Sequence, residues 1–189
     1  MKKRGLTENE IKKLEIYIRG TGSLRDLVIF RLSLDTMLRV GDVLTLKVKD
    51  VFFSDEVKET FKVKMMKTEN SVTCSLSEKT REILKKHILE NHLSNDDFLF
   101  QGRKKTGKSI SKVQWHRILK SFVDAVGIDE NEIATHSLRK SLPTIIYKKT
   151  GNLKVCQNLL GHKSISNTSL YIGVDEKESL DIKKSLNII

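Results

Sequence analysis

The apolar residues of this chain change their spacing over one short stretch, and that change restricts the possible folds more than any other feature. The residues concerned are Val51, Phe52, Phe53, Phe61, Val63, Met65, Val72 and Cys74. From Phe61 onward they alternate with polar residues, mostly lysines, and a period of two is typical of half-buried strands. The stretch therefore predicts two or three short antiparallel strands in one small sheet, with Lys67-Thr68-Glu69-Asn70 as a turn.

Helical spacing predominates on both sides of this stretch. Thr7 and Glu10 form a capping-box pattern that opens a first helix to about Arg19, and a second helix opens at Ser23 to Asp26. The apolar residues of this second helix share a face and are Leu27, Phe30, Leu34 and Leu38. Further helical patterns cover residues 77–91, 112–126, 135–149, 153–160 and 176–186. The expected fold class is mainly α with a small antiparallel β-sheet.

Breaks between segments are few, which bears on domain organisation. The chain has only one proline and ten glycines among its 189 residues, and no Ser/Gly-rich or Pro-rich linker. A chain of this length suits one domain with a single core. We therefore expect residues 1–189 to form a single domain, with a core over about residues 6–174 and a tail helix in residues 175–189.

The charge balance points to a polyanionic partner. Thirty-five Lys and Arg against 24 Asp and Glu give a formal net charge of +11. Such a balance suits nucleic acid first and an anionic membrane second, but no basic helix with a strongly apolar face supports the membrane. No apolar run reaches bilayer length, and the N-terminus lacks the apolar stretch of a signal peptide. Cys74 and Cys156 are 82 positions apart and suit two reduced thiols, so a cytoplasmic location is expected.

One short motif could carry chemistry. His136 and Arg139 are three residues apart, which on a helix places both on one face. Such a pair is common on helices that only expose two basic side chains, so its context has to decide. That context is Arg39 in Leu38-Arg39-Val40-Gly41-Asp42, His162 after Leu160-Gly161, and Tyr171 nine residues beyond that histidine.

These motifs, in this order, resemble the tyrosine recombinase or phage integrase family over about Leu6 to Val174. The family carries an Arg, a hairpin Lys, HxxR, a His or Trp, and a nucleophilic Tyr. The matching residues here are Arg39, Lys67, His136, Arg139, His162 and Tyr171. The resemblance implies the catalytic-domain fold of that family. It also implies cleavage and rejoining of DNA at specific sites through a covalent 3′-phosphotyrosyl intermediate, with Lys67 as general acid.

The residue types suit that chemistry without a cofactor. Two guanidinium groups, on Arg39 and Arg139, can neutralise the extra charge of a pentacoordinate phosphorane. His136 is the candidate base for the Tyr171 phenol, which at a pKa near 10 is otherwise protonated. His162 is expected to donate a hydrogen bond to the phosphate. No carboxylate pair or third histidine stands beside these motifs, so we expect no metal, no other cofactor and no small-molecule substrate.

Basic residues outside the motif are candidates for contacts with the DNA backbone. They are Lys62, Lys64, Arg103, Lys104, Lys105, Lys108 and Lys112. Such contacts bind without reading sequence, so the expected partner is double-stranded DNA whose target site the chain does not reveal. Trp115 opens a helix that could approach a groove, although a core position is expected for it. The resemblance implies a tetramer on DNA and a prokaryotic, phage or mobile-element origin.

Three features depart from the family pattern or leave alternatives open. Pro143 follows the HxxR motif and should either bend that helix or mark a later helix start, after His136. We expect no counterpart of the family's N-terminal DNA-clamping domain in these 189 residues, which would make the chain either a fragment of a longer integrase or a naturally short member similar to the fimbrial phase-switching invertases. The tail from Asp175 to Leu186 could dock on its own domain or on a neighbouring protomer.

Two other functions compete with recombination. A type IB topoisomerase shares this chemistry but relaxes DNA without strand exchange, and such enzymes usually lack the Leu-Gly-His motif before the tyrosine. A catalytically silent relative would only hold DNA, yet such a protein should have lost at least one of the six residues. Integration, excision, inversion and resolution all fit the sequence equally well.

Overall fold

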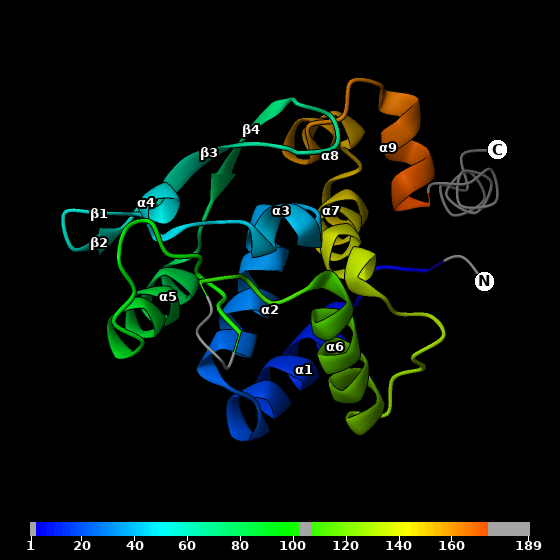
Figure 1. Ribbon diagram of the computed structural model, residues 1–189. Helices are drawn as coiled ribbons and strands as arrows, with labels where there is room; N and C mark the ends of the chain where they lie inside the picture. The colour runs from blue at the N-terminus through cyan, green and yellow to red at the C-terminus, as the bar shows by residue number, and fades with distance from the viewer. Residues whose placement is uncertain (1–2, 103–106, 174–189) are drawn as a thin grey trace, which may run out of the picture.

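The computed structural model describes residues 3–102 and 107–173 (Figure 1). In this part of the chain short β-structure separates two groups of helices. Before it come α1 (Glu8–Thr21), α2 (Leu24–Thr36), α3 (Val40–Leu44) and α4 (Val48–Val51). After it come α5 (Glu78–Glu90), α6 (Lys112–Ala125), α7 (Thr135–Thr150), α8 (Leu153–Leu160) and α9 (Ile165–Ile172). The mainly helical expectation is confirmed, and no described helix has the length and apolar character needed to cross a membrane.

The β-structure differs in detail from the single small sheet that the sequence predicts. Among the described residues β1 (Phe52–Phe53) pairs with β2 (Glu56–Val57), and β3 (Thr60–Lys64) pairs separately with β4 (Ser71–Ser75). Both pairs are antiparallel, and Phe61 lies opposite Cys74 in the longer one. The turn that carries Lys67 joins β3 to β4, as predicted.

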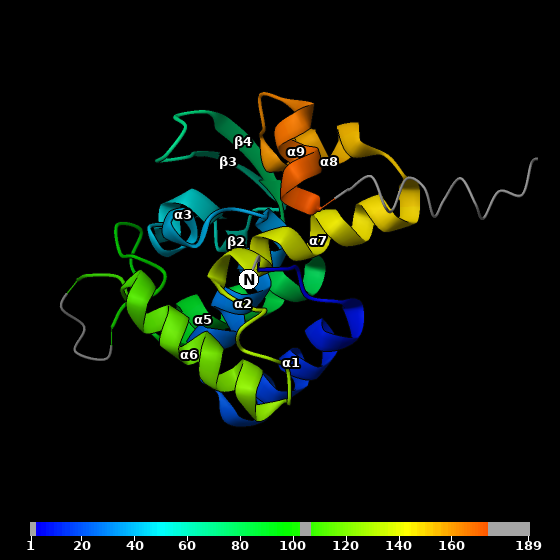
Figure 2. The same cartoon turned by 90° about the vertical axis from the view of Figure 1, so that its right-hand side faces the viewer.

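Helix α2 is the centre of the core. It contacts α1, α3, α5, α7 and β4, and Figures 1 and 2 show it enclosed by the other elements from both directions. Consequently it is buried on more than one side, and Val28, Ile29 and Leu32 are as deeply buried as Phe30. The prediction of one apolar face was therefore too narrow. Leu38 is buried but lies beyond the end of α2, because Met37 takes a left-handed conformation (φ 52°) that ends the helix.

Several local predictions are confirmed. Thr7 and Glu10 form a reciprocal capping box at the start of α1, in which each side chain accepts the other's backbone amide. Trp115 is fully buried in the core, and Cys74 and Cys156 are free and buried. The predicted tail helix lies outside the described residues.

Pro143 lies inside α7, nine residues into a helix that begins at Thr135. The alternative of a helix start after His136 is therefore wrong. Proline has no amide hydrogen, so the Arg139 carbonyl loses its usual helical donor. At its N-terminus α7 is stabilised by Ser137, whose hydroxyl accepts the Ala134 amide at 3.0 Å.

Candidate functional site

The first candidate residue, Arg39, stands at the start of α3. Its neighbours Leu38 and Val40 are buried in the core, whereas Arg39 itself is only half-buried as the N-cap residue of the helix. One guanidinium nitrogen of Arg39 lies 3.5 Å from the sulfur of Met65, the residue after β3. Arg39 therefore lies next to the base of the β3–β4 turn.

Asp42 ties α3 to the same turn. Its side chain is buried, and one carboxylate oxygen accepts the Met66 amide at 2.9 Å, while the other oxygen has no hydrogen-bond partner among the described residues. A hydrogen bond closes the base of the β3–β4 turn, where the Met65 amide donates to the Asn70 carbonyl at 2.9 Å. Lys67, one residue beyond Met66, is thus an exposed side chain on a turn whose base is anchored to α3.

The start of α6 lies close to Gly41 of α3. A Cβ atom at Gly41 would lie 2.5 Å from Cε and 2.7 Å from Nζ of Lys112. The first side chain of α6 therefore passes across Gly41. Because these two atoms are the flexible end of a lysine, a side chain at position 41 would displace only that end.

Arg139, by contrast, is deeply buried. It is 2% exposed, and its guanidinium donates to the Met37 carbonyl and, at 2.8 Å, to the Leu160 carbonyl. These carbonyls end α2 and α8, where unpaired acceptors and the negative end of the helix dipole favour a cation. Arg139 thus joins three helices and is fixed in position before any ligand binds.

His162 follows α8 because Gly161 ends that helix in the left-handed conformation (φ 65°). Its Nδ1 lies 3.1 Å from the Thr168 hydroxyl on α9, which fixes the orientation of the ring. The Tyr171 ring meets the His162 ring edge to face, with centroids 5.3 Å apart and planes at 89°. This arrangement places the last two candidate residues in direct contact.

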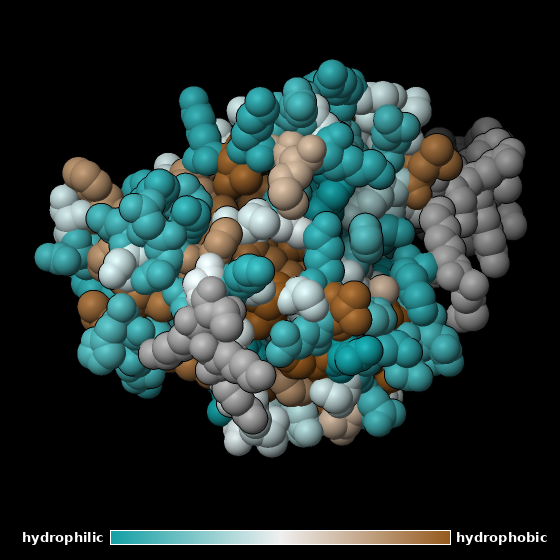
Figure 3. Space-filling view, viewed as in Figure 1, coloured by the Kyte–Doolittle hydropathy of each residue, from teal (hydrophilic) through white to brown (hydrophobic). Residues whose placement is uncertain are grey.

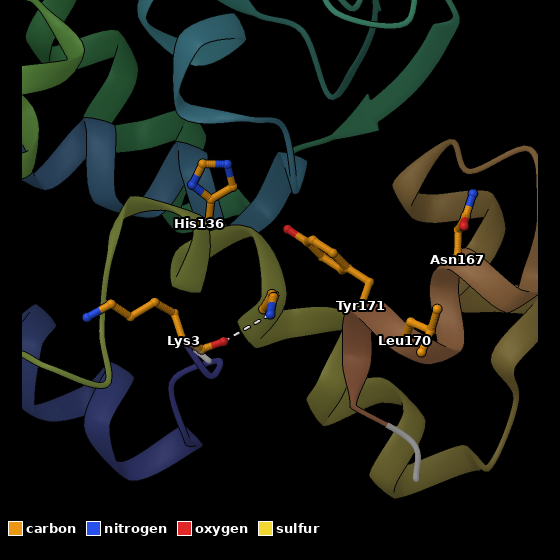
Figure 4. Close-up of a pocket in the computed structure, with 6 residues that line it drawn as sticks. Lys3, His136, Asn167, Leu170 and Tyr171 are labelled. Atoms are coloured by element: carbon orange, nitrogen blue, oxygen red, sulfur yellow. Dashed lines mark hydrogen bonds between the residues drawn. The ribbon is translucent and has the colours of Figure 1, made fainter. Parts of the chain in front are cut away.

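Tyr171 lies over Arg139. The guanidinium carbon is 6.0 Å from the Tyr171 ring centroid, and the hydroxyl end of the tyrosine points toward the start of α7, which carries His136 (Figure 4). The hydroxyl oxygen is buried and has no hydrogen-bond partner of ordinary geometry among the described residues. An open pocket of about 470 Å³ adjoins it and is lined by Lys3, His136, Lys140, Asn167, Leu170 and Tyr171.

The electrostatics of the site follow from burial and from its arginines. Burial raises the pKa of Tyr171, and the charges of Arg139 and Arg39 oppose that rise. Partial burial, then Arg139, then Arg39 lower the pKa of both His136 and His162, and Lys140 and then Lys67 lower that of His136 as well. Both imidazoles are therefore neutral near pH 7 and able to accept a proton, whereas the phenol is protonated.

The structure thus brings the candidates together around Tyr171. His136 and Tyr171 line one pocket, and His162 and Arg139 contact the Tyr171 ring. The charge of Arg39 acts on Tyr171, and the charge of Lys67 acts on His136. Sequence reasoning missed Lys3 and Lys140, because no spacing rule links the N-terminal segment to α7. The only signal was that Lys140 adjoins the HxxR motif. No group of three or more His, Cys, Asp or Glu side chains that could hold a metal occurs within residues 3–102 and 107–173.

Four of the other basic candidates lie on the surface. Lys62 and Lys64 are exposed on β3, and Lys108 and Lys112 are exposed before and at the start of α6. Hydrophilic side chains gather along the edge formed by β3, β4 and α8 (Figure 3). Arg103, Lys104 and Lys105 lie outside the described residues.

Comparisons with known proteins agree on one family. The model of the phage integrase family matches residues 4–178. The probable integrase/recombinase YoeC of Bacillus subtilis is 34% identical over 167 residues, which cover 88% of this chain and 87% of that protein. A tyrosine recombinase of Thermosipho africanus is 32% identical over 96% of this chain, but the match spans only 61% of that relative.

Among solved structures the fold is similar to that of the XerH site-specific recombinase bound to its palindromic difH substrate. The TM-score is 0.78 at 22% identity, and the match covers 98% of this chain and 53% of XerH. The chain thus spans about half to three fifths of the length of these longer relatives.

Proposed function

The chain belongs to the phage integrase family and is a tyrosine recombinase, and we propose that Tyr171 is the nucleophile with which it cleaves and rejoins DNA. The observation that carries this proposal is the packing of the Tyr171 ring between His162 and the buried Arg139. A phenol placed beside a fixed guanidinium can reach a phosphate that the same guanidinium binds.

In the proposed reaction the Tyr171 oxygen attacks the scissile phosphorus. A phosphorus–oxygen bond to the tyrosine forms, the bond to the 5′ oxygen breaks, and the phenol proton passes to His136. Lys67 gives its proton to the departing 5′ oxygen, which leaves as a hydroxyl. The 3′-phosphotyrosyl link is then attacked by a 5′ hydroxyl, of the same or another strand, in the reverse of these steps.

The protonation states of the site support these roles. The pKa of Tyr171 is raised by burial, so the phenol needs a base, and the depressed pKa of His136 keeps that imidazole neutral and ready to accept. Lys67 is exposed on an anchored turn, so its side chain can enter a bound duplex without disturbing the core.

The two arginines are proposed to bind the non-bridging oxygens of the scissile phosphate. Arg139 spends one donor on each of two carbonyls and retains others of its five for a ligand. Arg39 is half-buried, and within the described part of the chain it makes only a weak contact with the Met65 sulfur, so its fork is available. His162 supports the same phosphate by hydrogen bonding through its remaining ring nitrogen.

The duplex is proposed to lie across the basic surface around this pocket. Contacts with its phosphates are assigned to Lys62, Lys64, Arg103, Lys104, Lys105, Lys108 and Lys112. We also propose a specific target site, assembly as a tetramer on DNA and an origin in a phage or mobile element. The relatives compared above come from bacteria and include an enzyme crystallised with its recombination substrate.

The test of the nucleophile uses nicked suicide duplexes that trap a covalent protein–DNA adduct. The parent protein should form the adduct, and Tyr171→Phe should abolish it. Tyr147→Phe, which alters a half-buried tyrosine on α7, is the matched control and should leave the adduct intact. An adduct in the Tyr171→Phe variant would refute the assignment.

Two further readouts separate the competing functions and the acid. Relaxation of supercoils without strand exchange would indicate a topoisomerase, and DNA binding without any adduct would indicate a silent relative. A substrate whose 5′ bridging oxygen is replaced by sulfur has a leaving group that needs no proton. It should restore cleavage to Lys67→Ala but not to Tyr171→Phe, and failure of that rescue would remove Lys67 as the acid.

A further inference from the structure

The segment before α1 lies along the start of α7, directly behind the candidate site. Leu6 donates its amide to the Ser141 hydroxyl at 2.8 Å, and the Arg4 amide donates to the Glu132 carbonyl at 3.1 Å. A Cβ on Gly5 would come within 3.0 Å of the Ser141 Cα, so the two backbones are as close as a glycine permits. We call residues 3–6 the N-terminal strap.

Lys140 connects this strap to Tyr171. Its ammonium group donates to the Lys3 carbonyl at 2.9 Å, and the same nitrogen lies 5.1 Å from the Tyr171 ring centroid (Figure 4). The Lys3 carbonyl thus binds the ammonium group of Lys140 at a position where this group lies over the Tyr171 ring. Lys3, Lys140 and Tyr171 line the same pocket.

We propose that Lys140 is a positioning residue, which holds the Tyr171 ring at the pocket and favours the phenolate form of Tyr171. The N-terminal strap in turn fixes the position of Lys140. The catalytic relevance of this inference rests on the proposed function. The effect of Lys140 on the ionisation of Tyr171 can be measured independently of that function.

The distances support an electrostatic role. A cation within about 6 Å of an aromatic ring is attracted to its face. A phenolate ring carries more negative charge than the neutral phenol, so the same cation favours the ionised form. Arg139 and Arg39 also stand near the phenol, but a bound phosphate would take up their charge in the proposed reaction. Lys140 donates to the strap carbonyl and lies over the ring, so it is placed beside the tyrosine whether or not a phosphate is bound.

The test follows the ionisation of Tyr171 in the protein without DNA. The chain has three tyrosines, so labelling with 3-fluorotyrosine gives at most three ¹⁹F resonances, and Tyr171→Phe identifies the one of interest. The fluorinated phenol is more acidic than tyrosine, which lets it titrate while Lys140 remains charged. We expect Lys140→Met to raise the titration midpoint of this resonance by about one pH unit, a tenfold loss of phenolate at a given pH.

Two variants control for structural damage. Lys140→Arg keeps a charge and a donor and should retain the parent midpoint, and Lys148→Met removes an exposed lysine from the same helix and should also retain it. An unchanged midpoint in Lys140→Met would overturn the proposal, and so would an equal shift in Lys140→Arg.

The strap is tested through Gly5. Gly5→Ala would push the strap away from α7 and should raise the midpoint in the same direction as Lys140→Met, by a smaller amount. Gly20→Ala, at a glycine with nothing within 4 Å of the added Cβ, is the matched control and should leave the midpoint unchanged. No shift in Gly5→Ala would remove the strap from the proposal. Adduct formation by the parent tests the nucleophile separately, so failure of either idea is distinguishable.

Discussion

Gly161 and Val72 bring the end of α8 against the β3–β4 pair: a Cβ on Gly161 would lie 2.5 Å from Cγ2 of Val72. Gly161 also has a φ of 65°, which a side chain disfavours. His162 is the next residue, so the glycine determines both where α8 ends and where the imidazole enters the site.

Gly161→Ala is therefore expected to destabilise the protein by roughly 2 to 4 kcal/mol, as the sum of backbone strain and overpacking. Gly151→Ala separates the two causes, because Gly151 ends α7 with the same φ of 65° but has nothing within 4 Å of an added Cβ. It should cost about 1 kcal/mol. Urea unfolding measures both, and equal losses would contradict the contact with Val72.

Asp42 is expected to act through Lys67. Asp42→Ala removes the acceptor of the Met66 amide, should destabilise the protein by about 1 to 2 kcal/mol and should slow adduct formation. Asp42→Asn keeps an oxygen acceptor for the Met66 amide, so its stability and its rate of adduct formation should be closer to those of the parent. The sulfur-substituted duplex should restore the rate in Asp42→Ala, and a defect that persists on that substrate would mean that Asp42 does not serve the acid.

Acid should destabilise the fold through its histidines. Burial lowers the pKa of His87, whose Nε2 lies 2.7 Å from the Leu99 carbonyl, and burial also lowers those of His136 and His162. Below a pH of about 6.5 these histidines bind protons in the unfolded chain but stay largely unprotonated in the folded protein. The free energy of unfolding therefore decreases as the pH falls. Each histidine that stays unprotonated in the folded protein lowers the free energy of unfolding by up to about 1.4 kcal/mol per pH unit.

Urea unfolding at pH 7.5 and pH 5 measures this dependence. His87→Gln can keep a donor to the Leu99 carbonyl without a titrating ring, and should show a smaller loss between the two pH values than the parent. The same loss in both proteins would exclude His87 as a source of the acid sensitivity.

The two thiols are expected to be inert in the folded protein. Burial raises the pKa of Cys74 to about 12 and also raises that of Cys156, and both side chains are 2% exposed or less. A disulfide reagent at pH 8 should modify neither thiol in buffer and both in urea. Rapid native reaction of either residue would show that β4, which carries Cys74, or α8, which carries Cys156, opens locally.

Much of the fold could be predicted because local patterns agree with it. The capping box at Thr7, the alternation through Phe61 and the turn at Lys67 were read from neighbouring residues. The burial of α2 on several sides was not, because it depends on elements distant in sequence that pack around it.

The chemistry-bearing residues, their order and the nine-residue interval from His162 to Tyr171 are properties of the chain and can be found without a structure. Two contacts become evident only in the folded protein: the carbonyls of Met37 and Leu160 fix Arg139, and Lys140 lies between the strap and Tyr171. These contacts join segments up to 137 positions apart. No local propensity encodes them, because they form only when the core brings the helix ends together.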